Sequence, residues 1–240
     1  MQRYRDSARA LTDILGLTQP PIAVAFVDEQ PAGVATLAKQ APSACAIWRL
    51  AEMQIFYASA AAHAGCAVGS HVMGFSLSET TAQELAGSAQ LMVDSGYMGP
   101  DEIARLPRVR EPYAGIVYGP LAEFPLAAAA TLLWVRPSQS MLLEEGLGDV
   151  RWTASEVARV FGRPGCGALA VAVNTSGATR SAGCIGMRTF TRIGDELSAF
   201  VLPGGQIEAV VQRLRAAQDA NTKMLAHYKT QLAQFDMAVT

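Results

Sequence analysis

Charged side chains are scarce in this chain. They make up 17% of its 240 residues, and 19 Lys and Arg nearly balance 21 Asp and Glu. The net charge of −2, with no run of Lys or Arg, argues against a nucleic-acid binder, which normally carries a basic surface. Half of the residues are apolar, which excludes a disordered chain. The composition therefore indicates one well-cored globular domain over residues 1–240.

Long apolar runs are also missing. The longest, Leu126–Val135, has ten residues, about half of what a membrane-spanning helix needs. The first residues contain no apolar stretch typical of a signal peptide. We therefore expect a cytoplasmic protein with no membrane or nucleic-acid partner, in a compartment where thiols stay reduced. The four cysteines are then candidates for metal or redox chemistry rather than for disulfides.

Short apolar segments alternate with helical patterns along the chain. The segments that predict strands are Ile22–Val27, Gly115–Pro120, Thr131–Val135 and Leu197–Leu202. The segments that predict helices are Cys45–Ala62 capped by Ser43, Glu79–Gly87, Pro137–Gly146, a helix that begins at a Thr153–Glu156 capping box and ends at Gly162, and the last thirty residues. This alternation predicts an α/β fold, a mixed sheet with flanking helices.

A weak internal similarity indicates two halves from an old duplication, about 17–110 and 111–205, followed by a C-terminal helical segment 206–240. Each half has a strand, a cysteine, a helical stretch and a second cysteine preceded by Ala-Gly. The first pair, Cys45 and Cys66, is 21 positions apart, and the second, Cys166 and Cys184, is 18 apart. A pseudo-twofold axis would bring the two pairs towards a common centre.

The residues around the cysteines are unusual. Three cysteines directly follow glycine, which lets backbone groups approach closely; they are Cys66, Cys166 and Cys184. Cys45 and Cys184 are each followed four residues later by arginine, Arg49 and Arg188, which places thiol and guanidinium on one face of a helix. Such a guanidinium lowers the pKa of a thiol or holds an anionic ligand. The alternative is that the cysteines simply pack, as buried cysteines often do.

No Cys-x-x-Cys motif is present, so a four-thiolate site would have to be assembled by the fold from distant segments. Four thiolates is the ligand number of an iron–sulfur cluster or a closed zinc site. We therefore expect a metalloprotein with a redox or small-molecule role and a [4Fe–4S] cluster, with zinc as runner-up. The predicted metal ligands are Cys45, Cys66, Cys166 and Cys184, and the predicted cofactor-binding residues are Arg49, Gly65, Gly69, Gly186 and Arg188. His63 and His71 are candidates for a further ligand or a proton carrier, or are structural.

Several sequence blocks together resemble a known family, the uncharacterised domain of unknown function 169, also called ArCR, of bacteria and archaea. The resemblance runs from about Leu15 to Leu214. The blocks that carry it are Gln19–Val24, Cys45–Arg49 through Phe56-Tyr57, His63–Ser70 with Gly74, Val117–Pro120, Gly162–Cys166 and Gly183–Phe190. All four cysteines fall on these blocks, so the resemblance implies that the cysteines and glycines form one site. It implies no reaction.

Two other interpretations stay open, and so does the question of whether the protein is an enzyme. In one, a metal-free enzyme or sensor uses one activated thiol, Cys184 or Cys66, as nucleophile or redox switch. In the other, a binding module holds an anionic or tetrapyrrole-like ligand on its glycine loops and arginines. The expected partners are a small molecule or a redox partner protein. The C-terminal stretch with Leu225, Tyr228 and Leu232 either pairs with a second copy in a homodimer or packs on its own domain.

Overall fold

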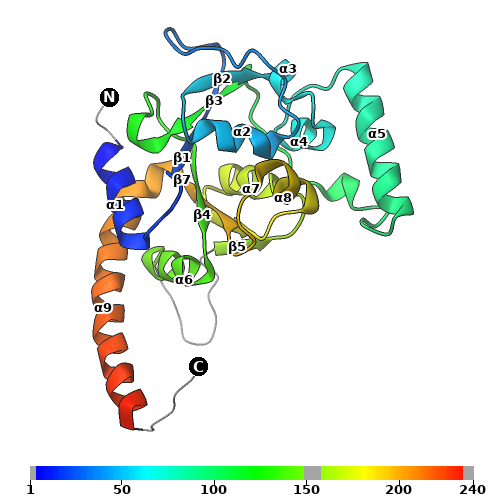
Figure 1. Cartoon of the computed structure of the whole chain (residues 1–240). Helices are drawn as coiled ribbons and strands as arrows, with labels where there is room; N and C mark the ends of the chain where they lie inside the picture. Colours follow the sequence, from blue (N-terminus) through cyan, green and yellow to red (C-terminus); the bar gives the residue numbers. More distant parts are fainter. Residues whose placement is uncertain (1–3, 149–157, 235–240) are drawn as a thin grey trace.

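The computed structural model describes residues 4–148 and 158–234. Within them, seven strands form one mixed sheet in the order β2-β3-β1-β4-β7-β6-β5 (Figure 1). The strands are β1 (Ile22–Val27), β2 (Phe56–Ser59), β3 (Gly115–Pro120), β4 (Ala130–Val135), β5 (Ala158–Phe161), β6 (Ala178–Ser181) and β7 (Ser198–Pro203).

The strand order is mirrored about the central pair β1–β4. Outward from this pair the order is β1, β3, β2 on one side and β4, β7, β6 on the other, and every one of these neighbours is antiparallel. At the centre, Ile22 lies opposite Leu132. Strand β5 is added outside β6 as its parallel neighbour. The sheet without β5 therefore has the same order and direction of pairing on both sides of its centre.

Helices cover both faces of the sheet. The helices on one face are α2 (Ala44–Ala51), α3 (Ala60–His63), α4 (Ala67–Val72), α7 (Gly167–Thr175) and α8 (Ile185–Thr191). Those on the other face are α1 (Arg5–Leu15), α6 (Pro137–Gly146) and α9 (Ile207–Gln234). The remaining helix, α5 (Glu79–Asp94), stands away from the sheet (Figure 1). This architecture confirms the α/β fold with a mixed sheet.

Two hydrophobic cores result, one on each face of the sheet. Alternate residues of β1 point to opposite cores, Ile22 and Val24 to one and Ala23 and Ala25 to the other, as the two-residue period of a strand requires. Because both faces are covered, the central strands are apolar at nearly every position, which explains why β1 and β4 were readily predicted.

The predicted helix Cys45–Ala62 is wrong between Ala51 and Ala60, although its last residues, 60–62, are helical in α3. Ser43 does cap it, since the Ser43 hydroxyl accepts a hydrogen bond from Ala46 N–H at 3.0 Å. Helix α2 then ends, and the chain turns into β2, where Tyr57 lies opposite Val117 of β3. The pairing of Phe56 and Tyr57 with β3 outweighs the helix propensity of the neighbouring alanines.

The prediction around Gly162 is also wrong. Its capping residues Thr153 and Glu156 lie outside the described residues, and residues 158–161, expected to be the end of a helix, form β5. The apolar segment that begins at Cys166 is helix α7, and the end of the following polar segment is strand β6. Parallel pairing of β5 with β6, a long-range contact, decides these local structures.

Helix α9 packs on the body only through its first half. Its buried residues are Ile207, Val210, Val211 and Leu214. The second half extends beyond the body (Figure 1). Its apolar side chains Met224, Leu225, Tyr228 and Leu232 are exposed. Within the described ranges, no helix combines the length and the apolar character needed to span a membrane.

Candidate thiol site

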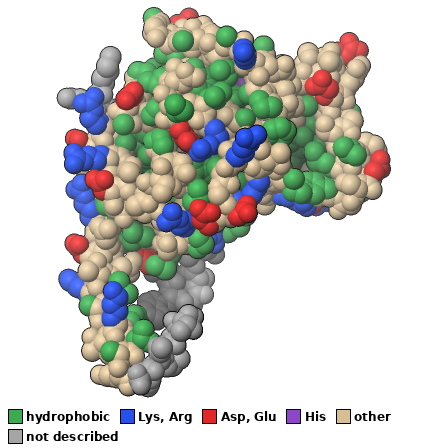
Figure 2. Space-filling view, viewed as in Figure 1, with side chains coloured by type: hydrophobic (Ala, Val, Ile, Leu, Met, Phe, Trp, Pro, Cys, Tyr) green, Lys and Arg blue, Asp and Glu red, His purple; other side chains and the backbone are tan. Residues whose placement is uncertain are grey.

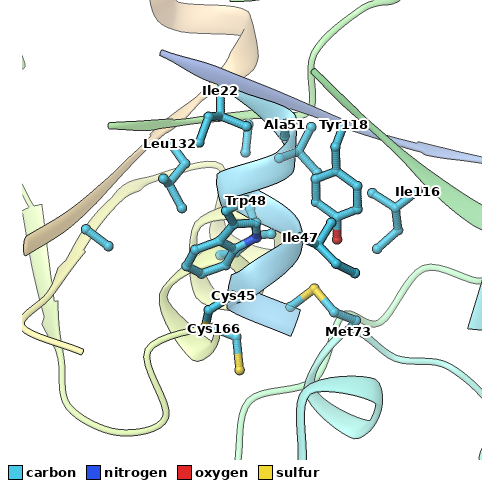
Figure 3. Packing of buried hydrophobic residues seen from close by; sticks show 14 of the residues in the cluster. Ile22, Cys45, Ile47, Trp48, Ala51, Met73, Ile116, Tyr118, Leu132 and Cys166 are labelled. Carbon is cyan, nitrogen blue, oxygen red and sulfur yellow. The ribbon is translucent and has the colours of Figure 1, made fainter. Parts of the chain in front are cut away.

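Each of the four cysteines lies at the start of a helix. Cys45 is the second residue of α2, and Cys66, Cys166 and Cys184 are the N-cap residues of α4, α7 and α8. All four are free thiols. Figure 3 shows Cys45 and Cys166 next to each other beneath the indole ring of Trp48.

Cys45 and Cys166 interact directly. Their side chains lie next to each other (Figure 3), and both residues are buried, with exposed fractions of 5% and 3%. The pKa of Cys45 is raised well above its usual value, first by the hydrogen bond to Cys166, then by burial, and finally by the charges of Cys166, Cys184 and Cys66. Cys45 is therefore a neutral thiol near pH 7.

Cys66 joins the starts of two helices. Its sulfur accepts a hydrogen bond from Gly69 N–H at 3.2 Å and another from the backbone of Ala44, the first residue of α2. Burial raises the pKa of Cys66, although these two N–H groups oppose the shift. Cys66 therefore holds α2 against α4 as well as capping α4.

Cys184 is the thiol that opens onto a cavity. Its sulfur accepts a hydrogen bond from Met187 N–H at 3.3 Å, which caps α8. The side chain is half-buried, packs against the core that contains Cys45 and Cys166, and lines a cavity of about 790 Å³.

Glycines near the cysteines allow close packing in the structure. A Cβ atom on Gly69 would lie 2.5 Å from the Cβ of Ala44 and 3.0 Å from the sulfur of Cys66. A Cβ atom on Gly165 would lie 3.3 Å from the Cα of Gly183. The segments that carry Cys166 and Cys184 therefore contact each other through these two glycines. Gly183 also has φ = +90°, a conformation that favours glycine.

The predicted metal centre is wrong. Over the described parts of the chain, no group of three or more His, Cys, Asp or Glu side chains is placed to hold a metal ion. The sulfurs of Cys66 and Cys184 cap their own helices, while the free thiols of Cys45 and Cys166 interact with each other. The four sulfurs therefore do not form one ligand set. This overturns the four-cysteine metalloprotein, the [4Fe–4S] cluster and the alternative zinc site.

The two arginines predicted to bind a cofactor have protein partners. Arg49 forms an ion pair with Glu52, which also accepts a hydrogen bond from Trp134 Nε1 at 2.9 Å. Arg49 does not make Cys45 a thiolate, since the pKa of that thiol is raised. Arg188 donates to four backbone carbonyls around α8, those of Ala182, Gly194, Asp195 and Leu197.

The remaining predicted residues lie near helix starts. A Cβ atom on Gly65 would lie 2.2 Å from the carbonyl oxygen of Ala41, so this glycine allows close backbone contact. Gly186, in the first turn of α8, lines the cavity together with Cys184.

His63 is a fully buried structural residue. Its Nδ1 lies 2.9 Å from the carbonyl oxygen of Ser59, and its Nε2 lies 3.1 Å from the hydroxyl of Tyr118. Burial lowers the pKa of His63 to about 4, so the ring is neutral near pH 7. His71 is half-buried, and its pKa is lowered by burial and by Arg108. Both ring nitrogens of His63 are thus already used inside the fold.

Sequence reasoning missed most of the cavity. Its walls come from α5, the 3-10 turn η1 (Ile103–Arg105), the segment 161–164 and the start of α8. Tyr97, Phe161 and Arg163 are among the lining residues. Arg163 lies within a sequence block that also contains Cys166, but nothing local indicated that Tyr97, more than sixty residues earlier, would meet it.

The fold and the site define a class of protein. It is a three-layer α/β domain, and its four thiols, each at the start of a helix, lie on one face of the sheet. Its family is that of the uncharacterised ArCR proteins, the domain of unknown function 169, to which the chain belongs because the family's model matches residues 10–213. No curated protein and no solved structure matches the chain.

Proposed function

We propose that the protein is a thiol redox protein in which Cys45 and Cys166 convert reversibly between a dithiol and a disulfide. The observation that carries this proposal is that these two free, buried thiols lie next to each other in the core (Figure 3). Two thiols in contact can be joined with little loss of chain entropy because the fold already holds them together.

The mirrored sheet supports the pairing of these two residues. Cys45 lies at the start of the helix between β1 and β2, and Cys166 at the start of the helix before β6. Because β1 mirrors β4 and β2 mirrors β6, the two thiols occupy comparable places in the two halves. We take the halves to be duplicates that join between β3 and β4, rather than at about residue 110 as expected from the sequence, so that the thiol pair lies near their pseudo-twofold axis.

The half-buried Cys184 gives an oxidant access to the pair. Its thiolate attacks the outer oxygen of a hydroperoxide, forming a sulfenic acid and releasing an alcohol or water. Cys45 attacks that sulfur and releases water, and Cys166 then displaces Cys184 from the mixed disulfide. The net reaction joins two thiols and reduces one hydroperoxide to an alcohol and water. Cys184 suits this role because it is half-buried and lines the cavity, whereas Cys45 and Cys166 are buried. A dithiol partner protein reverses the reaction.

The test is to oxidise the reduced, native protein with hydrogen peroxide or diamide and to map disulfides by mass spectrometry without reduction. A Cys45–Cys166 linkage that dithiothreitol removes is the expected product. Cys45→Ser and Cys166→Ser should each abolish it, and Cys184→Ser should slow its formation by hydrogen peroxide. Four thiols that stay titratable after oxidation of the native wild-type protein would overturn the proposal, and this outcome needs no variant to fold.

A further inference from the structure

The cavity next to Cys184 has the size and lining of a small-molecule site. Its volume of about 790 Å³ falls within the range of about 300–1,000 Å³ typical of ligand pockets. One wall is the arm formed by residues 79–106, and the other is the body at 161–164 and the start of α8. Figure 2 shows hydrophobic side chains gathered where this arm meets the body.

The walls of the cavity are mainly apolar. The apolar side chains that line it include Val68, Met92, Met98, Ile103, Leu106 and Phe161. Methionines adapt their shape to irregular or varied partners. These walls fit a compact apolar body rather than a sugar or a nucleotide.

A few polar groups occupy defined places in the same cavity. The guanidinium of Arg163 lies 4.1 Å from the centre of the Tyr97 ring, a stacking that orients it. The Tyr97 hydroxyl in turn accepts a hydrogen bond from Ile185 N–H at 3.2 Å, which fixes the ring between the arm and α8. Arg105 also lines the cavity, whereas Glu102, its one carboxylate, accepts a hydrogen bond from Gly99 N–H at 3.0 Å.

We propose that this cavity binds a small molecule with an apolar body and one anionic group, a carboxylate in the simplest case. The anionic group pairs with Arg163. Among the described residues that line the cavity, Arg105 and Arg163 carry positive charges and Glu102 a negative one, so the net charge of the lining is positive. The apolar body contacts Met92 and Phe161 and lies against the Cys184 thiol. This site does not depend on the proposed disulfide, and an occupant would control access of oxidants to Cys184.

Binding is tested with the reduced full-length protein and a fluorescent probe, 1-anilinonaphthalene-8-sulfonate, which combines an aromatic body with an anionic group. Decanoate and 2-naphthoate, the straight-chain and aromatic carboxylates, are used to displace it, with decanol as the uncharged control. We expect saturable probe binding and displacement by at least one carboxylate at a concentration about tenfold below that of decanol, as a charge-assisted hydrogen bond predicts.

Two variants and a labelling experiment locate the site. Arg163→Gln should remove the preference for carboxylate over decanol, whereas Arg215→Gln, on an exposed part of α9, should keep it. The displacing carboxylate should also slow alkylation of Cys184 by iodoacetamide several-fold. Absence of saturable binding, or equal affinity for carboxylates and decanol in the wild-type protein, would overturn the proposal. So would binding that neither responds to Arg163→Gln nor protects Cys184. Because the protein stays reduced throughout, none of these results bears on the Cys45–Cys166 disulfide.

Discussion

Cys45 and Cys166 lie 121 positions apart in the sequence, yet they lie next to each other in the core of the protein (Figure 3). The contact arises because α2 and α7 begin at the same place on one face of the sheet. The interaction with Cys166 and burial raise the pKa of Cys45, so this thiol is a poor nucleophile near pH 7.

The proposed role of Cys184 gives a kinetic prediction. In native protein, Cys184 should react with iodoacetamide faster than Cys45 and Cys166, because it is half-buried and lines a cavity while they are buried. Time-resolved alkylation followed by peptide mapping measures each rate. Urea-unfolded protein, in which all four thiols should react at similar rates, is the control. Faster labelling of Cys45 than of Cys184 in the native state would contradict the predicted order.

Gly69 is expected to tolerate no side chain. Gly69→Ala would place a Cβ atom 2.5 Å from that of Ala44 and force α4 away from α2, an overpacking that costs about 1–3 kcal/mol. Gly87→Ala is the matched control, since Gly87 is an exposed residue inside α5 with open space around it; it should stabilise the protein by about 0.5–1 kcal/mol. Urea denaturation measures both, and equal effects of the two substitutions would refute this packing argument.

The cap formed by Cys66 can be tested by changing only its acceptor atom. Cys66→Ala removes the acceptor for Gly69 N–H and Ala44 N–H and should lower the free energy of unfolding by about 1–2 kcal/mol. Cys66→Ser keeps an acceptor there and should lower it less. Thermal and urea unfolding of the two variants compare them, and a serine variant less stable than the alanine variant would argue against a capping role.

His63 predicts a pH dependence of stability. The pKa of His63 is about 4 in the folded state, whereas its ordinary value is 6.5. Between these two pH values the unfolded chain binds more protons than the folded state. The folded state therefore loses stability as the pH falls from 6.5 to 4. The loss reaches about 3 kcal/mol at the lower end. His71, whose pKa is also lowered, adds to it in the same direction. The free energy of unfolding from urea titrations at several pH values should fall less steeply in His63→Gln than in the wild-type protein. Parallel slopes would contradict the assignment to His63.

Arg188 should matter for the structure of the loops around α8. Its guanidinium donates to four carbonyls, a geometry that a lysine ammonium cannot reproduce. Arg188→Lys should therefore lower the free energy of unfolding by about 1–3 kcal/mol, while Arg215→Lys on exposed α9 should change it little. Urea denaturation distinguishes them. Equal stability of the two variants would show that the four bonds contribute nothing.

Local sequence patterns predicted the elements that local interactions determine. The apolar runs of β1 and β4, the Ser43 cap and the start of α6 at Pro137 all agree with the structure. Strands β2, β5 and β6 were missed because they are short and depend on pairing with distant segments. β6, with the sequence Ala-Thr-Arg-Ser, looks like a loop until β7 pairs with it.

The candidate site divides in the same way. The glycines directly before the cysteines indicated close backbone approach, and the structure shows it at Gly65 and Gly165. The number of cysteines, by contrast, suggested a metal centre, because residue counts carry no information about where sulfurs point. Helix capping by Cys66 and Cys184 depends on the exact backbone position at which each helix begins.

The mirrored strand order has a consequence for the ancestry that we propose. A single ancestral half would have had an unpaired edge strand, the equivalent of β1 and β4. Two copies would have joined through these edge strands in an antiparallel pair. Each copy would have supplied one thiol of the buried pair, so the redox bond of the ancestor would have linked two chains. Fusion into one chain would have freed the copies to diverge: over the residues that the structure describes, the buried His63 belongs to the first, and β5 and a thiol that opens onto the cavity belong to the second.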